Sequence, residues 1–200
     1  PVAGSVGHSD SVAGTAMDID GPHSPEQVIA GLRATSEGED LVQLLTPEGQ
    51  RVPHPRFDLE ISPGQLQSLY RDMVLVRRAD REAKALQRQG ELGLWAPLLG
   101  QEAAQVGAGR AMAPQDMAFP SYREHGVAWC RGVDPTEIFG IFRGIDQGSW
   151  DPIGTGFQLY TIVIPNQCLH ATGYAMGQRL DGKIGDADNA EATICFFGDG

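Results

Sequence analysis

The most regular hydrophobic pattern in the chain lies in residues 62–90, where apolar side chains recur at helical spacing among charged ones. This period predicts a long amphipathic helix with a charged outer face. Ser62 and Gln65 form a Ser-x-x-Gln capping box around a proline at the first helical position, and Gly90 is typical of a helix C-terminus. The apolar positions are Leu66, Leu69, Tyr70, Met73 and Leu86.

Two shorter segments also have helical patterns. Residues 100–112 contain several small side chains, which predict a helix that another backbone can approach closely. Residues 134–144 begin with Asp134 as N-cap and Pro135 at the first helical position, and Glu137 is placed to reach back to the cap. The small residues of the first segment are Ala103, Ala104, Gly107 and Ala108.

Two β-branched and aromatic runs, 158–164 and 192–197, predict buried strands. A helical run at 170–180 separates them, so the three segments predict a β-α-β unit with parallel strands. The expected fold class is therefore α/β, with a parallel sheet covered by helices on both faces. In such sheets ligands bind beyond the carboxyl ends of the strands.

The residues before this region have a different composition. Residues 1–39 are rich in Gly, Ser, Ala, Pro and Asp and have little periodic apolar content, which predicts a disordered or loosely attached tail. Residues 40–61 form a short extension in which LVQLLTPEGQRV alternates around a turn and predicts a hairpin. We assign residues 62–200 to the main folded domain.

Charge and cysteine content exclude several classes of protein. The chain has 26 acidic and 15 basic residues, a net charge of -11, which argues against a nucleic-acid partner. No stretch approaches the roughly 20 apolar residues of a membrane span, and no signal segment is recognisable. The three cysteines are isolated, which argues against a zinc site or disulfide framework and favours the cytoplasm. Because the chain begins with Pro and ends in Gly-Asp-Gly, we expect a fragment.

Two motifs have the chemistry of a phosphate site. Gly198, Asp199 and Gly200 follow the second predicted strand, where glycines let a backbone approach phosphate and a carboxylate can hold magnesium. Tyr122 and Arg123 supply a phenol and a guanidinium, and the guanidinium makes paired bonds to phosphate oxygens. Taken separately, the first motif is more often a plain turn, and the second more often a surface ion pair between Arg123 and Glu124 or a nearby Asp.

Four segments, GELGLWAPLLGQEAAQVGAGRAM, DMAFPSYREHGVAWCRGVDP, NQCLHATGYAMG and FFGDG, follow one another in the chain. In this order they resemble the alpha subunit of the thiamine-diphosphate-dependent decarboxylating component of 2-oxoacid dehydrogenase complexes, of the pyruvate and branched-chain types. The resemblance covers roughly residues 58–200. It implies that residues 62–200 are the N-terminal part of a thiamine diphosphate-binding fold, and that two alpha and two beta subunits form a heterotetramer with the cofactor between them.

The resemblance also assigns site residues. Tyr122 and Arg123 match a cofactor-contacting pair in which the Arg binds the diphosphate. Asp199 matches the acidic magnesium ligand, with Gly198 and Gly200 as its flanking glycines. The remaining implied cofactor contacts, near the aminopyrimidine, are Ile162 and Ile164. The family's further Asn ligand and a later active-site His would lie beyond the end of this chain.

The implied activity is oxidative decarboxylation of a 2-oxoacid, with transfer of the acyl group to a lipoyl group on the acyltransferase component. No residue of the chain is expected to act as a proton-transfer catalyst. Many pyruvate-type members carry a His where this sequence has Ala96, which leaves room for a larger 2-oxoacid. Two alternatives stay open: another thiamine diphosphate enzyme, of the acetoin or transketolase type, and a non-catalytic interaction module.

The remaining His and Trp residues are expected to have structural roles. His125 is expected to form a hydrogen bond within its own helix, and His170 to be structural or to lie at an interface. The three tryptophans are expected to pack rather than to line a pocket. They are Trp95, Trp129 and Trp150.

Overall fold

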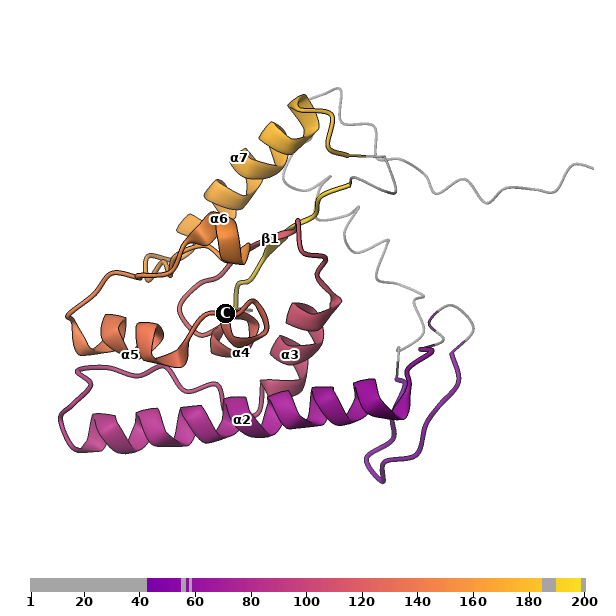
Figure 1. Ribbon diagram of the computed structural model, residues 1–200, viewed down its shortest axis with the longest axis horizontal. Coiled ribbons are helices and arrows are strands. Elements are labelled where there is room, and N and C mark those ends of the chain that lie inside the picture. The colour runs from indigo at the N-terminus through magenta and orange to yellow at the C-terminus, as the bar shows by residue number, and fades with distance from the viewer. Residues whose placement is uncertain (1–42, 55–56, 58, 185–189, 199–200) are drawn as a thin grey trace, which may run out of the picture. The chain divides into compact units, whose positions relative to one another are not determined.

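The computed structural model describes residues 43–54, 57, 59–184 and 190–198, which fall into two compact units divided between Leu59 and Glu60. The tail predicted at 1–39 lies outside the described residues. The second unit is mostly helical and contains a small parallel sheet (Figure 1). Its elements are α2 (Pro63–Arg88), α3 (Glu102–Ala111), β1 (Met117–Phe119), α4 (His125–Cys130), α5 (Pro135–Arg143), α6 (Pro152–Thr155), α7 (Asn166–Leu180) and β2 (Thr193–Cys195).

The first unit contains the expected hairpin. Leu45 and Arg51 form an antiparallel bridge, and the Val52 N–H donates to the Leu44 carbonyl at 3.0 Å. Gly49 occupies the turn with φ of 80°, a conformation that favours glycine.

Helix α2 begins and ends close to where the sequence predicts. The capping box is complete, because the Ser62 hydroxyl accepts from the Gln65 N–H and the Gln65 side chain accepts from the Ser62 N–H. The chain leaves the helix through Gly90, which has φ of 79°. Among the described residues, no helix combines the length and apolar character that crossing a bilayer requires.

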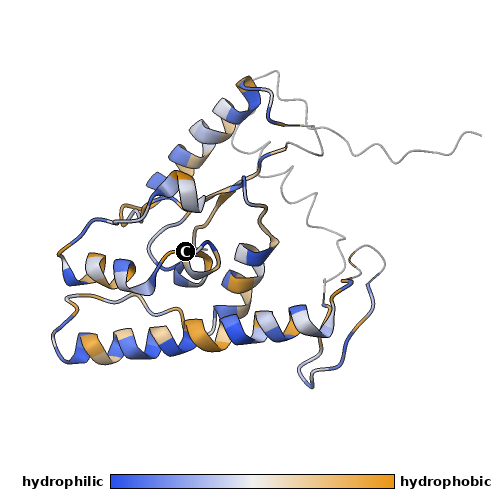
Figure 2. Ribbon diagram, in the orientation of Figure 1, coloured by the Kyte–Doolittle hydropathy of each residue, from blue (hydrophilic) through white to orange (hydrophobic). Residues whose placement is uncertain are grey.

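The buried face of α2 differs from the apolar face that its sequence indicates. Leu66 and Tyr70 are 58% and 66% exposed, whereas Asp72 and Asp80 are buried. Apolar and charged residues alternate along this helix (Figure 2). Both aspartates accept indole hydrogen bonds, Asp80 from Trp95 at 2.9 Å and Asp72 from Trp129 at 3.0 Å. Hydrogen-bonded carboxylates can therefore occupy positions that the hydrophobic period does not mark.

Helices α3 and α4 approach each other most closely at Gly109. A Cβ atom at this position would lie 2.7 Å from the Cys130 Cβ and 3.3 Å from the Val127 Cα. The sequence indicated close approach at other residues, such as Ala103 and Gly107, but Ala103 is exposed and a Cβ atom added at Gly107 would meet no other atom within 4 Å.

We expect Gly109→Ala to lower the free energy of unfolding by about 1–3 kcal/mol, because the added methyl group forces α3 and α4 apart. Gly107→Ala is the matched control on the same helix. It adds a methyl group in open space and should stabilise the protein by up to about 1 kcal/mol through helix propensity. Urea unfolding of both variants measures the difference, and equal stabilities would contradict the proposed contact.

Strands β1 and β2 pair in parallel, with Met117 opposite Thr193 and Phe119 opposite Cys195. The prediction of parallel pairing is confirmed for the second run, since β2 lies within 192–197. Its partner is β1, however, and not the predicted strand at 158–164.

The prediction of a strand at 158–164 is wrong. Phe157 forms one parallel bridge with Ala118, and the Gln158 N–H donates to the Ala118 carbonyl at 2.9 Å. Beyond this point the chain leaves β1, and Ile162 and Ile164 are 60% and 59% exposed. β-branched side chains favour extended backbone, but a strand also needs a neighbour along its whole length, which this run lacks among the described residues.

The two faces of β1 contact different parts of the unit (Figure 1). Ala118 packs into a core cluster with residues of α4 and α5, such as Val127 and Phe142. Met117 and Phe119 point the other way and pack with Ala171 of α7. Helices therefore contact β1 from both sides, and the carboxyl ends of β1 and β2 meet at one edge.

Candidate functional site

A hollow of about 160 Å³ lies beside the carboxyl ends of β1 and β2. It collects four of the residues that the sequence selects, although they are far apart in the chain: Tyr122, Arg123, Ile164 and Gly198. The remaining lining residues are Gln101, Ser121, Glu124, Gln167 and Phe197. The hollow therefore has charged, amide and apolar walls.

Glu124 shapes the segment that carries the Tyr-Arg pair. Its buried carboxylate accepts hydrogen bonds from the backbone N–H of Ser121 at 2.8 Å and of Arg123 at 3.2 Å, and from the Ser121 hydroxyl at 3.0 Å. Three donors on one carboxylate hold this turn in a single conformation. The Ser-x-x-Glu spacing from Ser121 is the signal in the sequence that marks this contact.

The Arg123 side chain is half-buried and forms no ion pair with a carboxylate among the described residues. Its guanidinium donates to the Pro97 carbonyl and lies 5.5 Å from the centre of the Tyr122 ring. The expected alternative, a surface pair with Glu124, is therefore not formed, because that carboxylate bonds to the backbone N–H instead. A guanidinium has five N–H donors, so Arg123 retains donors for a ligand.

The backbone of Arg123 is also held by Gln105, which is buried on α3. Its amide N–H donates to the Arg123 carbonyl at 3.1 Å, and its oxygen accepts from the Gly126 N–H at 2.8 Å. This contact was not anticipated, because nothing in the sequence distinguishes Gln105 from an exposed helical glutamine.

The other wall of the hollow comes from the first turn of α7 and the end of β2. Ile164 precedes the helix, and Gln167 in its first turn donates to the Phe196 carbonyl at 3.1 Å. Ile162 is not among the lining residues. Two further predicted site residues, Asp199 and Gly200, lie outside the described residues.

His125 follows the Tyr-Arg pair and is buried. Its Nε2 lies 2.9 Å from the Ala96 carbonyl and its Nδ1 lies 2.7 Å from the Tyr160 hydroxyl. A carbonyl only accepts, so Nε2 carries the proton and Nδ1 accepts from Tyr160. The expectation of a hydrogen bond within its own helix is wrong, because both ring nitrogens bond to other segments.

Burial lowers the pKa of His125 to about 4, despite the opposing effects of the Ala96 carbonyl and the Asp80 charge. Burial also raises the pKa of Tyr160 well above its ordinary value. Both groups are therefore neutral at physiological pH. The two hydrogen bonds of His125 connect the segments that contain Ala96 and Tyr160.

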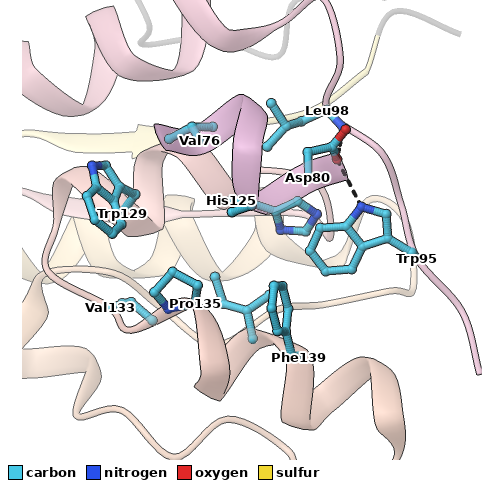
Figure 3. A pocket seen from close by; sticks show the side chains of 11 residues that line it. Val76, Asp80, Trp95, Leu98, His125, Trp129, Val133, Pro135 and Phe139 are labelled. Atoms are coloured by element: carbon cyan, nitrogen blue, oxygen red, sulfur yellow. Dashed lines mark hydrogen bonds between the residues drawn. The ribbon is translucent and has the colours of Figure 1, made fainter. Parts of the chain in front are cut away.

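The tryptophans pack, as expected. The Trp95 indole stacks on the His125 ring with centroids 4.3 Å apart, and its N–H donates to Asp80 (Figure 3). Trp150 donates to the Phe157 carbonyl at 2.9 Å. The cavity of about 20 Å³ beside Trp95 has room for one water molecule and is too small for a cofactor. Ala96 belongs to the same core and does not line the hollow.

The chain is similar to known proteins over most of its length. Residues 70–200 match the family described as dehydrogenase E1 component. The chain is 39% identical over 160 residues to 3-methyl-2-oxobutanoate dehydrogenase subunit alpha of Mycobacterium tuberculosis. The aligned residues cover 80% of this chain and 42% of that protein.

Two other relatives are named for a different substrate, pyruvate. The pyruvate dehydrogenase E1 component subunit alpha of Acholeplasma laidlawii is 34% identical over 150 residues, covering 75% of this chain and 42% of the relative. That of Bacillus cereus is 31% identical over 169 residues, covering 84% and 44%. The chain thus spans less than half the length of these relatives. It belongs to the dehydrogenase E1 component family, among the alpha subunits.

Proposed function

We propose that this chain is part of the alpha subunit of a thiamine-diphosphate-dependent 2-oxoacid dehydrogenase. The protein would decarboxylate pyruvate or a branched-chain 2-oxoacid oxidatively and transfer the acyl group to a lipoyl group. The names of the relatives support this reaction class, and they include both substrate types. Magnesium would join the cofactor to the protein.

The observation that carries the proposal is that Arg123 and Gly198 line one hollow. Arg123 supplies a cation with donors to spare, and the N-terminus of α7 adds the partial positive charge of a fifteen-residue helix. Among the described residues that line the hollow, Glu124 is the only carboxylate, and its oxygens are engaged by the turn. The polar wall therefore suits an anion such as a diphosphate.

The residues present fit part of the cofactor. The hollow is smaller than the roughly 300–1,000 Å³ of a typical small-molecule pocket, which suits the diphosphate end, with the rest held by a beta subunit. In this proposal Asp199, which follows Gly198 directly, binds magnesium, with Gly200 beside it. Ile162 and Ile164 would contact the aminopyrimidine end once a partner covers them.

When bound, thiamine diphosphate supplies the electron sink for loss of carbon dioxide. The residues of this chain then bind and orient it. Arg123 holds the diphosphate, Tyr122 limits the position of the guanidinium, and the apolar side chains of Ile164 and Phe197 exclude water. His125 does not transfer protons, because both of its ring nitrogens are already hydrogen-bonded and it is buried.

A beta subunit and a lipoyl-bearing acyltransferase are the proposed partners. The exposed apolar side chains of α7 are consistent with a protein partner, since Leu169 and Leu180 are 74% and 85% exposed. We propose an assembly of two alpha and two beta subunits. The larger sheet of the thiamine diphosphate-binding fold, covered by helices on both faces, would require chain beyond the described residues.

The test uses the full-length alpha subunit with its beta subunit. Calorimetric titration with thiamine diphosphate and magnesium should show saturable binding, and carbon dioxide release should be measured from pyruvate and from 3-methyl-2-oxobutanoate. Release from one of them supports the proposal and identifies the substrate class. Cofactor binding without release from either favours an acetoin-type enzyme, and no binding favours a non-catalytic interaction module.

A further inference from the structure

The Gln167 side chain is almost completely buried, with 2% of its surface exposed, and only half of its amide is hydrogen-bonded. Its N–H donates to the Phe196 carbonyl at 3.1 Å. Its Oε1 atom has no partner, and it is the only buried side-chain nitrogen or oxygen without one in the part of the chain that the structure describes. Buried polar atoms are nearly always hydrogen-bonded, so this one calls for an explanation.

A reversed amide would not remove the problem. Turning the side chain over would bring its oxygen against the Phe196 carbonyl, two acceptors in contact, and would leave the amide nitrogen buried without an acceptor. The orientation is therefore fixed by Phe196, and Oε1 is an acceptor that lacks a donor.

Gln167 lines the hollow that also contains Arg123 and Gly198. None of the other lining side chains that carry donors bonds to Oε1 in this structure: Gln101, Ser121, Tyr122 and Arg123. Gln167 also lies in the first turn of α7, whose N-cap, Pro165, provides no side-chain hydrogen bond. The described residues therefore supply no donor to Oε1, and a molecule bound in the hollow would supply one.

We propose that Gln167 is a binding residue of this hollow, and that its Oε1 atom accepts a hydrogen bond from a donor carried by the bound magnesium and cofactor. This rests on the proposed function. An ionised diphosphate has no donor, so the donor is either a water molecule on magnesium, which usually keeps several, or an N–H group of the cofactor. Gln167 would thus accept a hydrogen bond from the group that is bound together with the diphosphate, whereas Arg123 binds the diphosphate itself.

A second buried glutamine on the same helix provides a matched control. Gln178 is 5% exposed, and both ends of its amide are bonded. Its oxygen accepts from the Thr193 hydroxyl at 2.5 Å and its N–H donates to Glu191 at 3.2 Å. It does not line the hollow. The two glutamines therefore differ in whether their acceptor already has a donor.

The experiment compares Gln167→Met and Gln178→Met in the full-length alpha subunit with its beta subunit. We expect Gln167→Met to weaken thiamine diphosphate binding about tenfold, the effect of one hydrogen bond, by titration calorimetry. Its melting temperature without ligand should change little, because the loss of the Phe196 bond is offset by removal of an unpaired acceptor. Gln178→Met should lower that melting temperature and leave the affinity within twofold of wild type.

Two magnesium regimes identify the donor. If the loss of thiamine diphosphate affinity disappears at saturating magnesium and the midpoint of the magnesium titration is shifted instead, the donor is a metal-bound water. If the loss of affinity persists at saturating magnesium, the donor is an N–H group of the cofactor. Unchanged affinity of Gln167→Met in both regimes overturns the inference, as does a fall in its unligated melting temperature equal to that of Gln178→Met. If the wild-type assembly binds no cofactor, the proposed function itself fails, and this inference fails with it.

Discussion

Replacing Arg123 with Ala should weaken binding of thiamine diphosphate on the order of 100-fold, the largest change in ligand affinity that we expect from one residue. A guanidinium forms two charge-assisted hydrogen bonds to a diphosphate, each worth about 1.5–3 kcal/mol. In the variant, water molecules replace part of these bonds, which reduces the loss. Among the described residues, the lining of the hollow contains no second cationic side chain to replace it. Titration calorimetry on the full-length alpha subunit with its beta subunit measures the effect.

Two variants separate the diphosphate contact from general effects of charge. Arg123→Lys keeps the charge but loses the fork of donors, and its affinity should fall by about tenfold. Arg143→Ala removes an arginine whose pair with Glu91 at 2.9 Å is exposed, so its affinity should equal that of the wild type. An Arg123→Ala protein that binds within threefold of wild type would remove Arg123 from the site.

Lowering the pH from 6.5 to 4 should destabilise the protein by about 3 kcal/mol through His125 alone, because burial lowers its pKa to about 4. Within this window the unfolded chain takes up a proton at this residue and the folded chain does not. The contribution of neutral His125 to the free energy of unfolding is therefore fully present above pH 6.5 and is lost as the pH falls toward 4. Urea unfolding at intervals across the window measures the slope.

The contribution of His125 is isolated by substitution. His125→Gln keeps a donor and an acceptor but has no ionisable group, so its stability should depend less steeply on pH between 6.5 and 4. His170→Gln removes an exposed histidine from α7 and should retain the wild-type slope. A His125→Gln protein with an unchanged pH dependence would show that the buried imidazole does not drive acid unfolding.

The sequence alone determined those features whose hydrogen bonds are local. The beginning of α2 follows from Ser62 and Gln65, and the beginning of α5 follows from Asp134, whose carboxylate accepts from the Thr136 N–H at 2.8 Å. Such bonds join residues two or three positions apart, so neither helix start depends on the rest of the fold. The order of four motifs along the chain was likewise enough to indicate the family, which the match over residues 70–200 confirms.

The sheet was decided by tertiary structure. The run at 158–164 has strand composition but only one bridge, whereas the short segment at β1 pairs with β2 along its length. A strand is stabilised by hydrogen bonds to a distant neighbour, and residue propensity does not say which neighbour is available. The same reason explains α2, where distant donors allow two aspartates to be buried. Asp80 accepts from Trp95 and the Leu98 N–H. Asp72 accepts from Trp129 and pairs with Arg110.

The candidate site shows both contributions. The sequence selected Tyr122, Arg123 and Gly198 by residue type and order, and the fold brought them to one hollow. Gln167 had no signal in the sequence, because a buried amide is distinguished only by its partners, whereas Glu124 stands at Ser-x-x-Glu spacing from Ser121. Local chemistry therefore determined the helices and the motif residues, whereas long-range pairing decided which strands form, which polar groups are buried and which acceptor remains without a donor.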